Sequence, residues 1–381
     1  MVRALQMGTS TAKVHAGCAG GSAAPPPVTP EFLAAFRARV HGRPGAAAER
    51  RGGPDCAEEA MTFAEFMALA LYDERVGYYR REWRRVGRGE GTDFYTASSS
   101  GAVFGALVVA ACVRLLGGEA EAARHTFVEI GAEPDETGPA FRGRGGVLTG
   151  VAHPFAGART VRLGEPLALS GAGVVFSNEL FDAQPLRRFV RRDGGWRELG
   201  VAVRGEVLSE VELGGVSEPW LPADAPAGYV FDAPRTAVAL ADAMATQPWH
   251  GLFVAFDYGK SLAELATATP DGTVRAYHRH TQSNDLLARP GEQDLTGHVC
   301  WDWLAAALAA HGFDTAAVES QEAFFVRHAA GWLELALADQ APPSVLRRRA
   351  ITQLLHPAQM GQKFQVLHAR RTPAGASGQG R

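Results

Sequence analysis

The stretch that decides the fold is Thr126-Phe127-Val128-Glu129-Ile130-Gly131, a short apolar run that ends in a glycine. Its β-branched and aromatic residues favour a strand, and the glycine permits a tight turn after it. Further apolar runs at residues 160–163, 174–176 and 252–256 each lead into polar or turn residues. Such runs are typical of parallel strands that are buried on both faces. The sequence therefore predicts an α/β sheet with ligand groups at the carboxyl ends of its strands.

Helices are predicted before and between these strands. Thr62 and Glu65 have the spacing of a capping box, followed by apolar residues at helical intervals up to about residue 72. A second apolar helix is expected over 103–116, with Gly117-Gly118 as a left-handed cap. Helical patterns recur at 236–244 and 302–311. Because helical and strand patterns alternate, the fold class is α/β.

An antiparallel hairpin is predicted where residues 189–192 and 196–203 flank Asp193-Gly194-Gly195. Residues 1–60 are rich in glycine and proline and are expected to be a weakly ordered leader. Residues 61–370 then form the main domain, with a helical part at 62–118 and an α/β core with insertions at 126–330. Residues 371–381 are expected to be a disordered tail.

The leader leaves two interpretations of location open. Arg3 and Lys13 precede the first acidic residue, Glu31, and an acid-free basic start is found in mitochondrial transit peptides. Two basic residues among many glycines and prolines are few for that purpose. We favour a bacterial leader and a cytoplasmic protein, with the mitochondrial matrix as the alternative.

Composition argues against several classes of partner. The chain has 38 Lys and Arg against 41 Asp and Glu, a net charge of −3, which gives no general attraction for nucleic acid or anionic lipid. No apolar stretch is long enough to span a membrane. Four cysteines without a C-x-x-C pair suggest neither a disulfide framework nor a zinc site. A metal site could be built from the ligand-type residues His278, His280, Asp294 and His298. We favour a role in the pocket wall for these residues and predict no metal.

Six segments carry a resemblance to a known family. They are Gly91-Thr92-Asp93-Phe94-Tyr95-Thr96 with Phe104-Gly105, Val128-Glu129-Ile130-Gly131, Asn178-Glu179-Leu180-Phe181-Asp182-Ala183-Gln184-Pro185, Asp257-Tyr258-Gly259, Pro290-Gly291-Glu292-Gln293-Asp294-Leu295-Thr296, and Met360-Gly361-Gln362-Lys363-Phe364.

Together these segments resemble the MidA-like family of S-adenosylmethionine-dependent methyltransferases, over roughly residues 62–370. The mitochondrial member of that family is the complex I assembly arginine methyltransferase. The resemblance implies a Rossmann-like class I methyltransferase sheet with an added N-terminal helical subdomain and a β-hairpin insertion. It also implies S-adenosylmethionine as cofactor and a protein arginine as acceptor, with a complex I-type subunit as a candidate protein partner. It does not address the oligomeric state.

Asn178, Glu179 and Asp182 are the candidate catalytic residues. They follow a predicted strand and place an amide and two carboxylates within five residues. Carboxylates are suited to bind a guanidinium and to accept its proton. The alternative is a loop cap in which Asp182 accepts backbone amides before Pro185. Spacing alone slightly favours the cap, whereas the resemblance favours the catalytic role.

Four residues are candidates for cofactor binding. Glu129 and Gly131 form the turn after the first strand, where a glycine lets the backbone approach a ligand closely. Glu165 is a candidate for the ribose hydroxyls, with a solvated strand end as the equal alternative. Thr96 is expected to line the cofactor pocket, with a turn hydroxyl as its alternative.

The turn after the first strand departs from the family pattern of a glycine-rich loop. Glu133 replaces the second glycine, and Pro134 removes a backbone donor. Glu133 would place a negative charge where the carboxylate of the cofactor approaches. Two like charges about 4 Å apart repel by about 4 kcal/mol at an effective dielectric constant near 20. Two hypotheses follow. The chain is either a working methyltransferase with a divergent loop or a non-catalytic binding or assembly factor, and we favour the enzyme.

Overall fold

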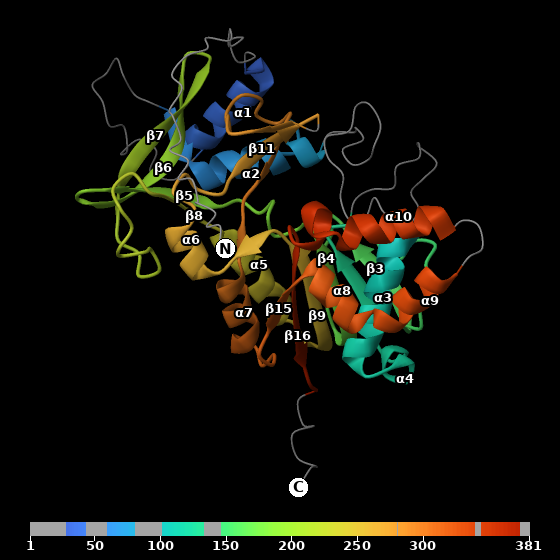
Figure 1. Cartoon of the computed structure of the whole chain (residues 1–381). Coiled ribbons are helices and arrows are strands. Elements are labelled where there is room, and N and C mark those ends of the chain that lie inside the picture. Colours follow the sequence, from blue (N-terminus) through green and yellow to red (C-terminus); the bar gives the residue numbers. More distant parts are fainter. Residues whose placement is uncertain are drawn as a thin grey trace, which may run out of the picture.

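A computed structural model of the chain describes residues 28–42, 59–80, 101–132, 146–279, 281–339 and 344–373 (Figure 1). The helices are α1 (Pro30–His41), α2 (Phe63–Tyr72), α3 (Ala102–Leu116), α4 (Glu119–Ala122), α5 (Arg235–Ala245), α6 (Leu262–Thr267), α7 (Trp301–Ala310), α8 (Gln321–His328), α9 (Ala330–Ala338) and α10 (Ser344–Leu355). Two short helical turns, η1 (Tyr78–Arg80) and η3 (Pro357–Gly361), complete the helical elements.

The strands form a large mixed sheet, an antiparallel sheet and two small sheets. They are β1 (Glu59–Thr62), β2 (Thr126–Ile130), β3 (Gly157–Val161), β4 (Gly171–Asn178), β5 (Arg187–Arg192), β6 (Gly195–Arg204), β7 (Val207–Val216), β8 (Val230–Ala233), β9 (Trp249–Asp257), β10 (Gly259–Lys260), β11 (Arg275–His278), β12 (Thr281–Ser283), β13 (Asp294–Thr296), β14 (Val299–Cys300), β15 (Ala317–Ser320) and β16 (Gln365–Arg371).

The large sheet has the order β15-β16-β9-β4-β2-β3. Strands β3, β2, β4 and β9 run parallel, whereas β16 is antiparallel to both β9 and β15. The register pairs Ile130 with Ser177 and Asn178 with Phe256, so β2, β4 and β9 end at the same edge. The predicted parallel sheet is confirmed, and the residues that follow these strands are brought together.

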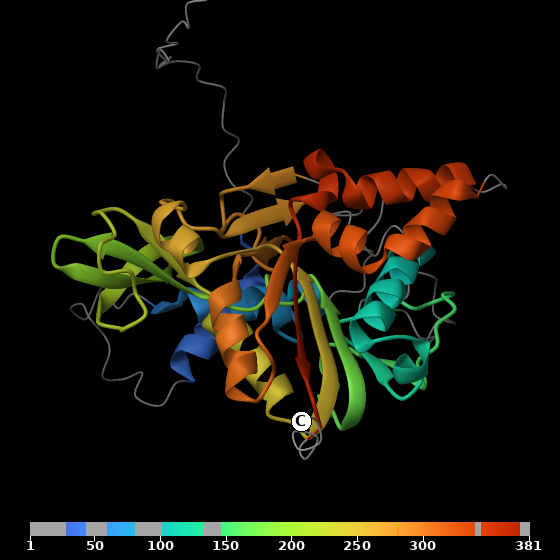
Figure 2. The same ribbon diagram turned by 60° about the horizontal axis from the view of Figure 1, so that its bottom comes forward.

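Helices cover both faces of this sheet (Figure 2). Successive side chains of strand β4 point to opposite faces of the sheet. Val174 and Phe176 point to the face that α3, α8 and α10 cover. Val175 points to the opposite face, where α5 and α7 pack. The fold is therefore an α/β/α sandwich, as the apolar runs predict.

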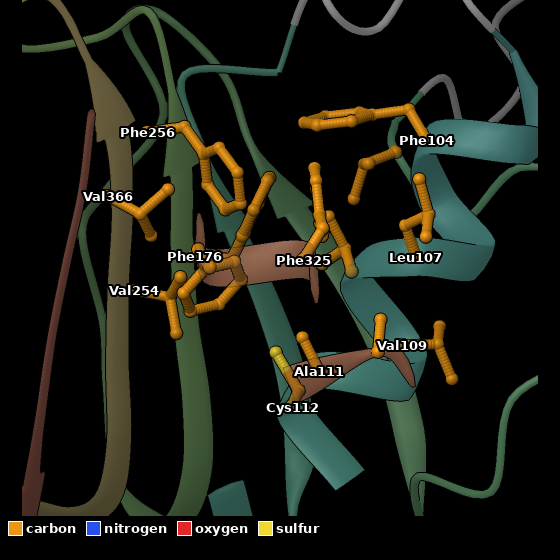
Figure 3. Packing of buried hydrophobic residues seen from close by; sticks show 14 of the residues in the cluster. Phe104, Leu107, Val109, Ala111, Cys112, Phe176, Val254, Phe256, Phe325 and Val366 are labelled. Carbon is orange, nitrogen blue, oxygen red and sulfur yellow. The ribbon is translucent and has the colours of Figure 1, made fainter. Parts of the chain in front are cut away.

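Aromatic rings hold α3 and α8 against the sheet (Figure 3). The Phe104 ring of α3 lies 5.5 Å from that of Phe256 on β9, edge to face, and 6.0 Å from that of Phe325 on α8. All three side chains are fully buried. Edge-to-face pairs at this spacing add to the stabilisation from burial alone. Aromatic contacts thus fix the large sheet near the edge where β4 and β9 end.

The predicted hairpin is part of a larger antiparallel sheet. Arg192 pairs with Gly195 across its two-residue turn, so β5 and β6 form as expected. The sheet also contains β8, β7 and β1, and β1 pairs with β6 through Met61 and Val201. Helices α1 and α2 pack on this sheet. The insertion therefore has a hydrophobic core of its own.

The N-terminal part differs from the sequence prediction in two respects. Residues 30–41, which we placed in a weakly ordered leader, form α1, because Thr29 caps the helix and Phe32 and Phe36 are fully buried. Helices α2 and α3 are not one helical unit, because α2 packs on the antiparallel sheet and α3 on the large one. The caps themselves are as predicted, since the Thr62 box is complete and Gly117 has a φ of 100°.

None of the described helices is long and apolar enough to cross a membrane.

Candidate active site

The acidic loop begins where β4 ends. Asn178 is the last residue of β4, and Glu179 takes a positive φ of 51°. The Glu179 amide donates to the Phe256 carbonyl at 2.9 Å, which continues the pairing with β9 by one residue. A positive φ is uncommon for a residue with a side chain. The chain is therefore turned sharply at Glu179, directly after the strand.

Asp257 holds this loop in place from the end of β9. Its side chain is fully buried, and Oδ2 accepts the Phe181 amide at 2.9 Å and the Asp182 amide at 3.4 Å. Oδ1 accepts the Tyr258 amide at 2.8 Å. Burial raises the pKa of Asp257 to about 7, although these hydrogen bonds favour the charged form. Asp257 thus caps the loop, and Asp182 also accepts a backbone amide, that of Ala183, as in the loop-cap alternative.

Asp182 is a buried carboxylate of this loop with one oxygen that lacks a partner. Its residue is 4% exposed, and Oδ1 is buried without a hydrogen bond to any described residue. Asn178 Oδ1 and Ser177 Oγ lack partners in the same way. Burial raises the pKa of Asp182 well above its usual value, and Asp257 and Glu179 raise it further. Buried polar groups are normally paired, so these three atoms keep unused hydrogen-bonding capacity at the end of β4.

A second family segment meets the acidic loop. The Gly297 amide donates to the Asp182 carbonyl at 2.9 Å, which joins the loop to the end of β13. Asp294 begins β13 and is paired with Tyr277 of β11. The Asp294 charge also raises the pKa of Asp182. Carboxylates from residues more than a hundred positions apart therefore share one electrostatic environment.

Tyrosines from the N-terminal elements close over these carboxylates. The Tyr79 hydroxyl donates to Asp294 Oδ1 at 2.9 Å, and the Tyr72 hydroxyl donates to the Ala183 carbonyl at 2.8 Å. The two rings are stacked with centroids 5.4 Å apart. Burial, followed by the Asp294 charge, raises the pKa of Tyr79 well above its usual value. The antiparallel sheet and its helices thus contribute directly to the site.

We call this group the acidic aromatic cluster. It comprises Glu179, Asp182, Asp257 and Asp294 with Tyr72, Tyr79, Tyr258 and Tyr277. Burial raises the pKa of Tyr258, and the charges of Glu179 and Asp182 raise it further. The negative charges of neighbouring carboxylates raise one another's pKa values. A cation that entered the cluster would interact favourably with each ionised carboxylate.

The predicted cofactor residues lie at the neighbouring strand ends. Glu129 is buried on β2, and its Oε2 accepts the Val147 amide at 2.7 Å. Burial raises the pKa of Glu129 to about 7. Gly131 has a φ of 80°, and a Cβ built there would lie 2.7 Å from Leu180 Cδ1 of the acidic loop. The cofactor turn and the acidic loop are therefore in direct contact.

The remaining cofactor predictions have different outcomes. Glu165 is exposed, and its Oε2 accepts the amide of Arg162 at 2.8 Å, which is the strand-end role that we set beside the ribose role. The ribose role stays a prediction. Thr96, Glu133 and Pro134 lie outside the described residues.

Comparisons with known proteins show which proteins this chain is similar to. A family model described as "Putative S-adenosyl-L-methionine-dependent methyltransferase" matches residues 161–318. The chain is 24% identical over 221 residues to the protein arginine methyltransferase NDUFAF7, mitochondrial, of Rattus norvegicus, which covers 55% of this chain and only 49% of that relative. The protein of the same name from Danio rerio is 23% identical over 366 residues, covering 82% of this chain and 84% of the relative.

The chain is thus similar to methyltransferases of the MidA-like family. A crystal structure from Burkholderia thailandensis, bound to S-adenosyl-homocysteine, superimposes with a TM-score of 0.70 at 22% identity. The superposition covers 90% of this chain and 94% of that chain, so the fold extends over nearly the whole molecule. The MidA-like assignment made from the six segments is thereby confirmed.

Three of the residues that we predicted, Asn178, Glu179 and Asp182, lie together in the loop after β4. The Asn178 Nδ2 donates to Glu179 Oε1 at 3.0 Å. The sequence analysis missed the tyrosines and the role of Asp257. The signal for Asp257 was present, since it ends an apolar strand as Asn178 does. No pattern in the sequence connects Tyr72 and Tyr79 to this edge of the sheet.

Proposed function

We propose that this protein transfers a methyl group from S-adenosylmethionine to an arginine side chain of a protein substrate. The observation that carries the proposal is the buried Asp182 with its unpartnered Oδ1, surrounded by further carboxylates. The methyltransferase class is that of the MidA-like family, and arginine is the acceptor named for its mitochondrial relatives.

The acceptor argument is electrostatic. A guanidinium has five N–H donors and stays charged at any ordinary pH, so it suits a site with several carboxylate oxygens. Its arrival would lower the pKa of Asp182 and supply the hydrogen bond that Oδ1 lacks. The aromatic rings of Tyr72, Tyr79 and Tyr258 are suited to enclose a planar cation. A neutral acceptor would leave the mutual repulsion of the carboxylates in place.

S-adenosylmethionine, when bound, supplies a methyl group on a sulfonium sulfur. In the proposed reaction a guanidinium nitrogen forms the new N–C bond as the C–S bond breaks, and the nitrogen gives up one proton. Asp182 accepts that proton at Oδ1, Glu179 and Asn178 orient the guanidinium, and Asp257 fixes the loop that carries them. Much of the rate is expected from orientation, which contributes about 7–11 kcal/mol in good intramolecular models.

Glu129 and Gly131 are the proposed cofactor contacts. A carboxylate suits the amino group of the methionine moiety, and Glu129 is buried at the end of the first strand with one oxygen on the Val147 amide. The contact between Gly131 and Leu180 places this turn beside the acidic loop. The donor and the acceptor would therefore be held by neighbouring strand ends, as transfer requires.

The protein partner and the location are proposals of the same kind. A respiratory complex I-type subunit is the proposed substrate, by similarity to the complex I assembly relatives. The curated relatives are named as mitochondrial proteins. We retain the cytoplasm as the predicted location, and the mitochondrial matrix as its alternative.

The competing function is a non-catalytic binding or assembly factor. It is favoured by Glu133 and Pro134, which replace glycine-loop positions of the family. In that case the acidic aromatic cluster would still bind an arginine of a partner protein, but no methyl group would be transferred.

The experiment is a methyl-transfer assay with isotopically labelled S-adenosylmethionine and cell extract, followed by acid hydrolysis of the labelled protein. The proposal predicts that the label elutes as methylarginine and that Asp182→Asn abolishes it. Label in methyllysine or in small molecules would contradict the arginine assignment. If the protein transfers no more label than a boiled control, the proposal is contradicted and the non-catalytic binding factor is the remaining function.

A further inference from the structure

We propose that Glu319, His328 and His368 bind a divalent transition-metal ion such as Zn²⁺ at the edge of the large sheet. The three residues belong to three elements, since Glu319 is on β15, His328 ends α8 and His368 is on β16. One ligand atom from each lies within 4.8 Å of the others. None of the three belongs to the acidic aromatic cluster.

Both histidines point the same ring atom at one carboxylate oxygen. His328 Nε2 lies 2.8 Å and His368 Nε2 lies 3.1 Å from Glu319 Oε1. Each contact requires the histidine to donate a proton from Nε2 to the same acceptor. A metal ion between the three atoms would replace both shared protons with one cation.

The donor set selects the class of ion. Two imidazoles and one carboxylate suit Zn²⁺, Co²⁺ or Fe²⁺ better than Mg²⁺ or Ca²⁺, which prefer oxygen ligands alone. Zn–N and Zn–O distances are about 2.0–2.2 Å, so the three atoms need to separate only slightly to accept the ion. Three protein ligands would leave one position of a tetrahedral zinc for water.

The site is enclosed well enough to select its ligand. The Glu319, His328 and His368 side chains are 7%, 13% and 14% exposed, respectively. The Phe324 ring lies 5.0 Å from the His328 ring and 5.6 Å from the His368 ring. An apolar wall of this kind limits water and holds the imidazoles in place.

Arg327 competes with the ion for Glu319. Its Nη1 lies 2.7 Å from Glu319 Oε2, the oxygen that the histidines do not use. The Arg327 side chain is 67% exposed, so it can move into solvent when a cation binds. The proposal therefore predicts that Arg327→Gln strengthens metal binding, a result that a purely structural ion-pair network would not give.

The proposed role of the ion is to fasten α8 to the sheet. Strand β15 pairs with β16, whereas α8 is joined to them at its start by the Gln321 amide and the Phe364 carbonyl. At the other end of α8, the ion would replace the hydrogen bond between His328 and Glu319 with a metal bridge. Binding should thus raise the thermal stability of the protein, with the logarithm of the ion concentration once that concentration exceeds Kd.

The test uses the full chain without an affinity tag, freed of metal with a chelator and titrated with Co²⁺ and Zn²⁺. We expect one Co²⁺ per chain with the visible absorption of a four- or five-coordinate ion, and displacement by Zn²⁺. Glu319→Gln keeps the hydrogen-bond acceptor and the packing, and should weaken binding by more than the roughly 10–100-fold caused by loss of an outer-shell partner. His328→Ala should do the same.

The matched control is His311→Ala, which removes a histidine that lies 2.7 Å from Asp242 elsewhere on the fold. It should leave binding unchanged. The proposal is overturned if the metal-free parent protein takes up no stoichiometric Co²⁺, or if Glu319→Gln binds Co²⁺ as tightly as the parent. It is also overturned if His311→Ala weakens Co²⁺ binding as much as His328→Ala does.

Discussion

Asp182 and Asp257 are both buried carboxylates of the acidic aromatic cluster, yet their contacts give them different roles. Asp257 accepts three backbone amides and fixes the loop. Asp182 has an oxygen without a partner and is surrounded by other charges. Of these two carboxylates, Asp182 is therefore the one that we propose as the substrate contact.

Asp182→Asn should lower the turnover number by about 100-fold or more, because the variant cannot accept a proton. The affinity for S-adenosylmethionine should change little, since the carboxamide has nearly the same shape. Initial rates and calorimetric binding measure the two quantities separately. Asp193→Asn, in the exposed hairpin turn, is the control. Equal losses of turnover and cofactor affinity would contradict the role of Asp182.

Glu129 makes the stability of the protein depend on pH. Its pKa is raised to about 7 in the folded state, so ionisation opposes folding as the pH rises from about 4.5 through 7. Glu129→Gln keeps the acceptor for the Val147 amide and removes this cost. We expect the variant to be more stable than the parent by roughly 1–3 kcal/mol at pH 8, with a much smaller difference at pH 5.

Urea unfolding at the two pH values measures this effect. Glu165→Gln is the control, because Glu165 also accepts a backbone amide but is exposed. A Glu129→Gln variant that is less stable than the parent at pH 8 would show that the buried charge is stabilised by groups that we have not identified.

Elements with a local signal were predictable. The capping box at Thr62, the glycine cap after α3 and the run of β2 all depend on neighbouring residues, and all lie where the sequence places them. The acidic loop was predictable because it follows an apolar strand. The place of Asp257 at the end of a strand was predictable as well, but its capping role was not, because the loop that it caps is about 75 residues away in the chain.

Gly131 tests the contact between the cofactor turn and the acidic loop. Gly131→Ala should destabilise the protein by about 1–3 kcal/mol, because φ is positive and the new methyl group meets Leu180. It should also weaken binding of S-adenosylmethionine. Gly150→Ala has a similar φ of 70° with no atom within 4 Å, and should cost only the backbone strain. Equal losses of unfolding free energy in the two variants would mean that the Leu180 side chain moves aside without an energetic penalty.

At the scale of the whole molecule, the sequence predicted the α/β sheet and the insertion but not how they combine. Strand β1 pairs with β6 across a long separation, and α1 and α2 pack on that sheet. Composition alone placed residues 30–41 in a leader, since the glycine and proline around them hide a short helix. Tyr72 and Tyr79 reach the site only through this tertiary arrangement.

The assignment of α1 to the folded domain gives a stability prediction. Phe36 is fully buried, so Phe36→Ala should lower the free energy of unfolding by about 3–5 kcal/mol. Arg39→Ala, on the exposed side of the same helix, should have little effect. Chemical denaturation of both variants is the measurement. A neutral Phe36→Ala would mean that residues 30–41 do not contribute to the core.

The central claim is that a methyl donor binds beside the acidic aromatic cluster despite the altered turn at Glu133. Calorimetric titration of the purified protein with S-adenosylmethionine tests it most directly. The account predicts saturable binding of one molecule per chain, weakened by Gly131→Ala and retained by Asp182→Asn. Absence of heat at millimolar ligand would contradict it and leave a methyltransferase fold that binds a partner without catalysis.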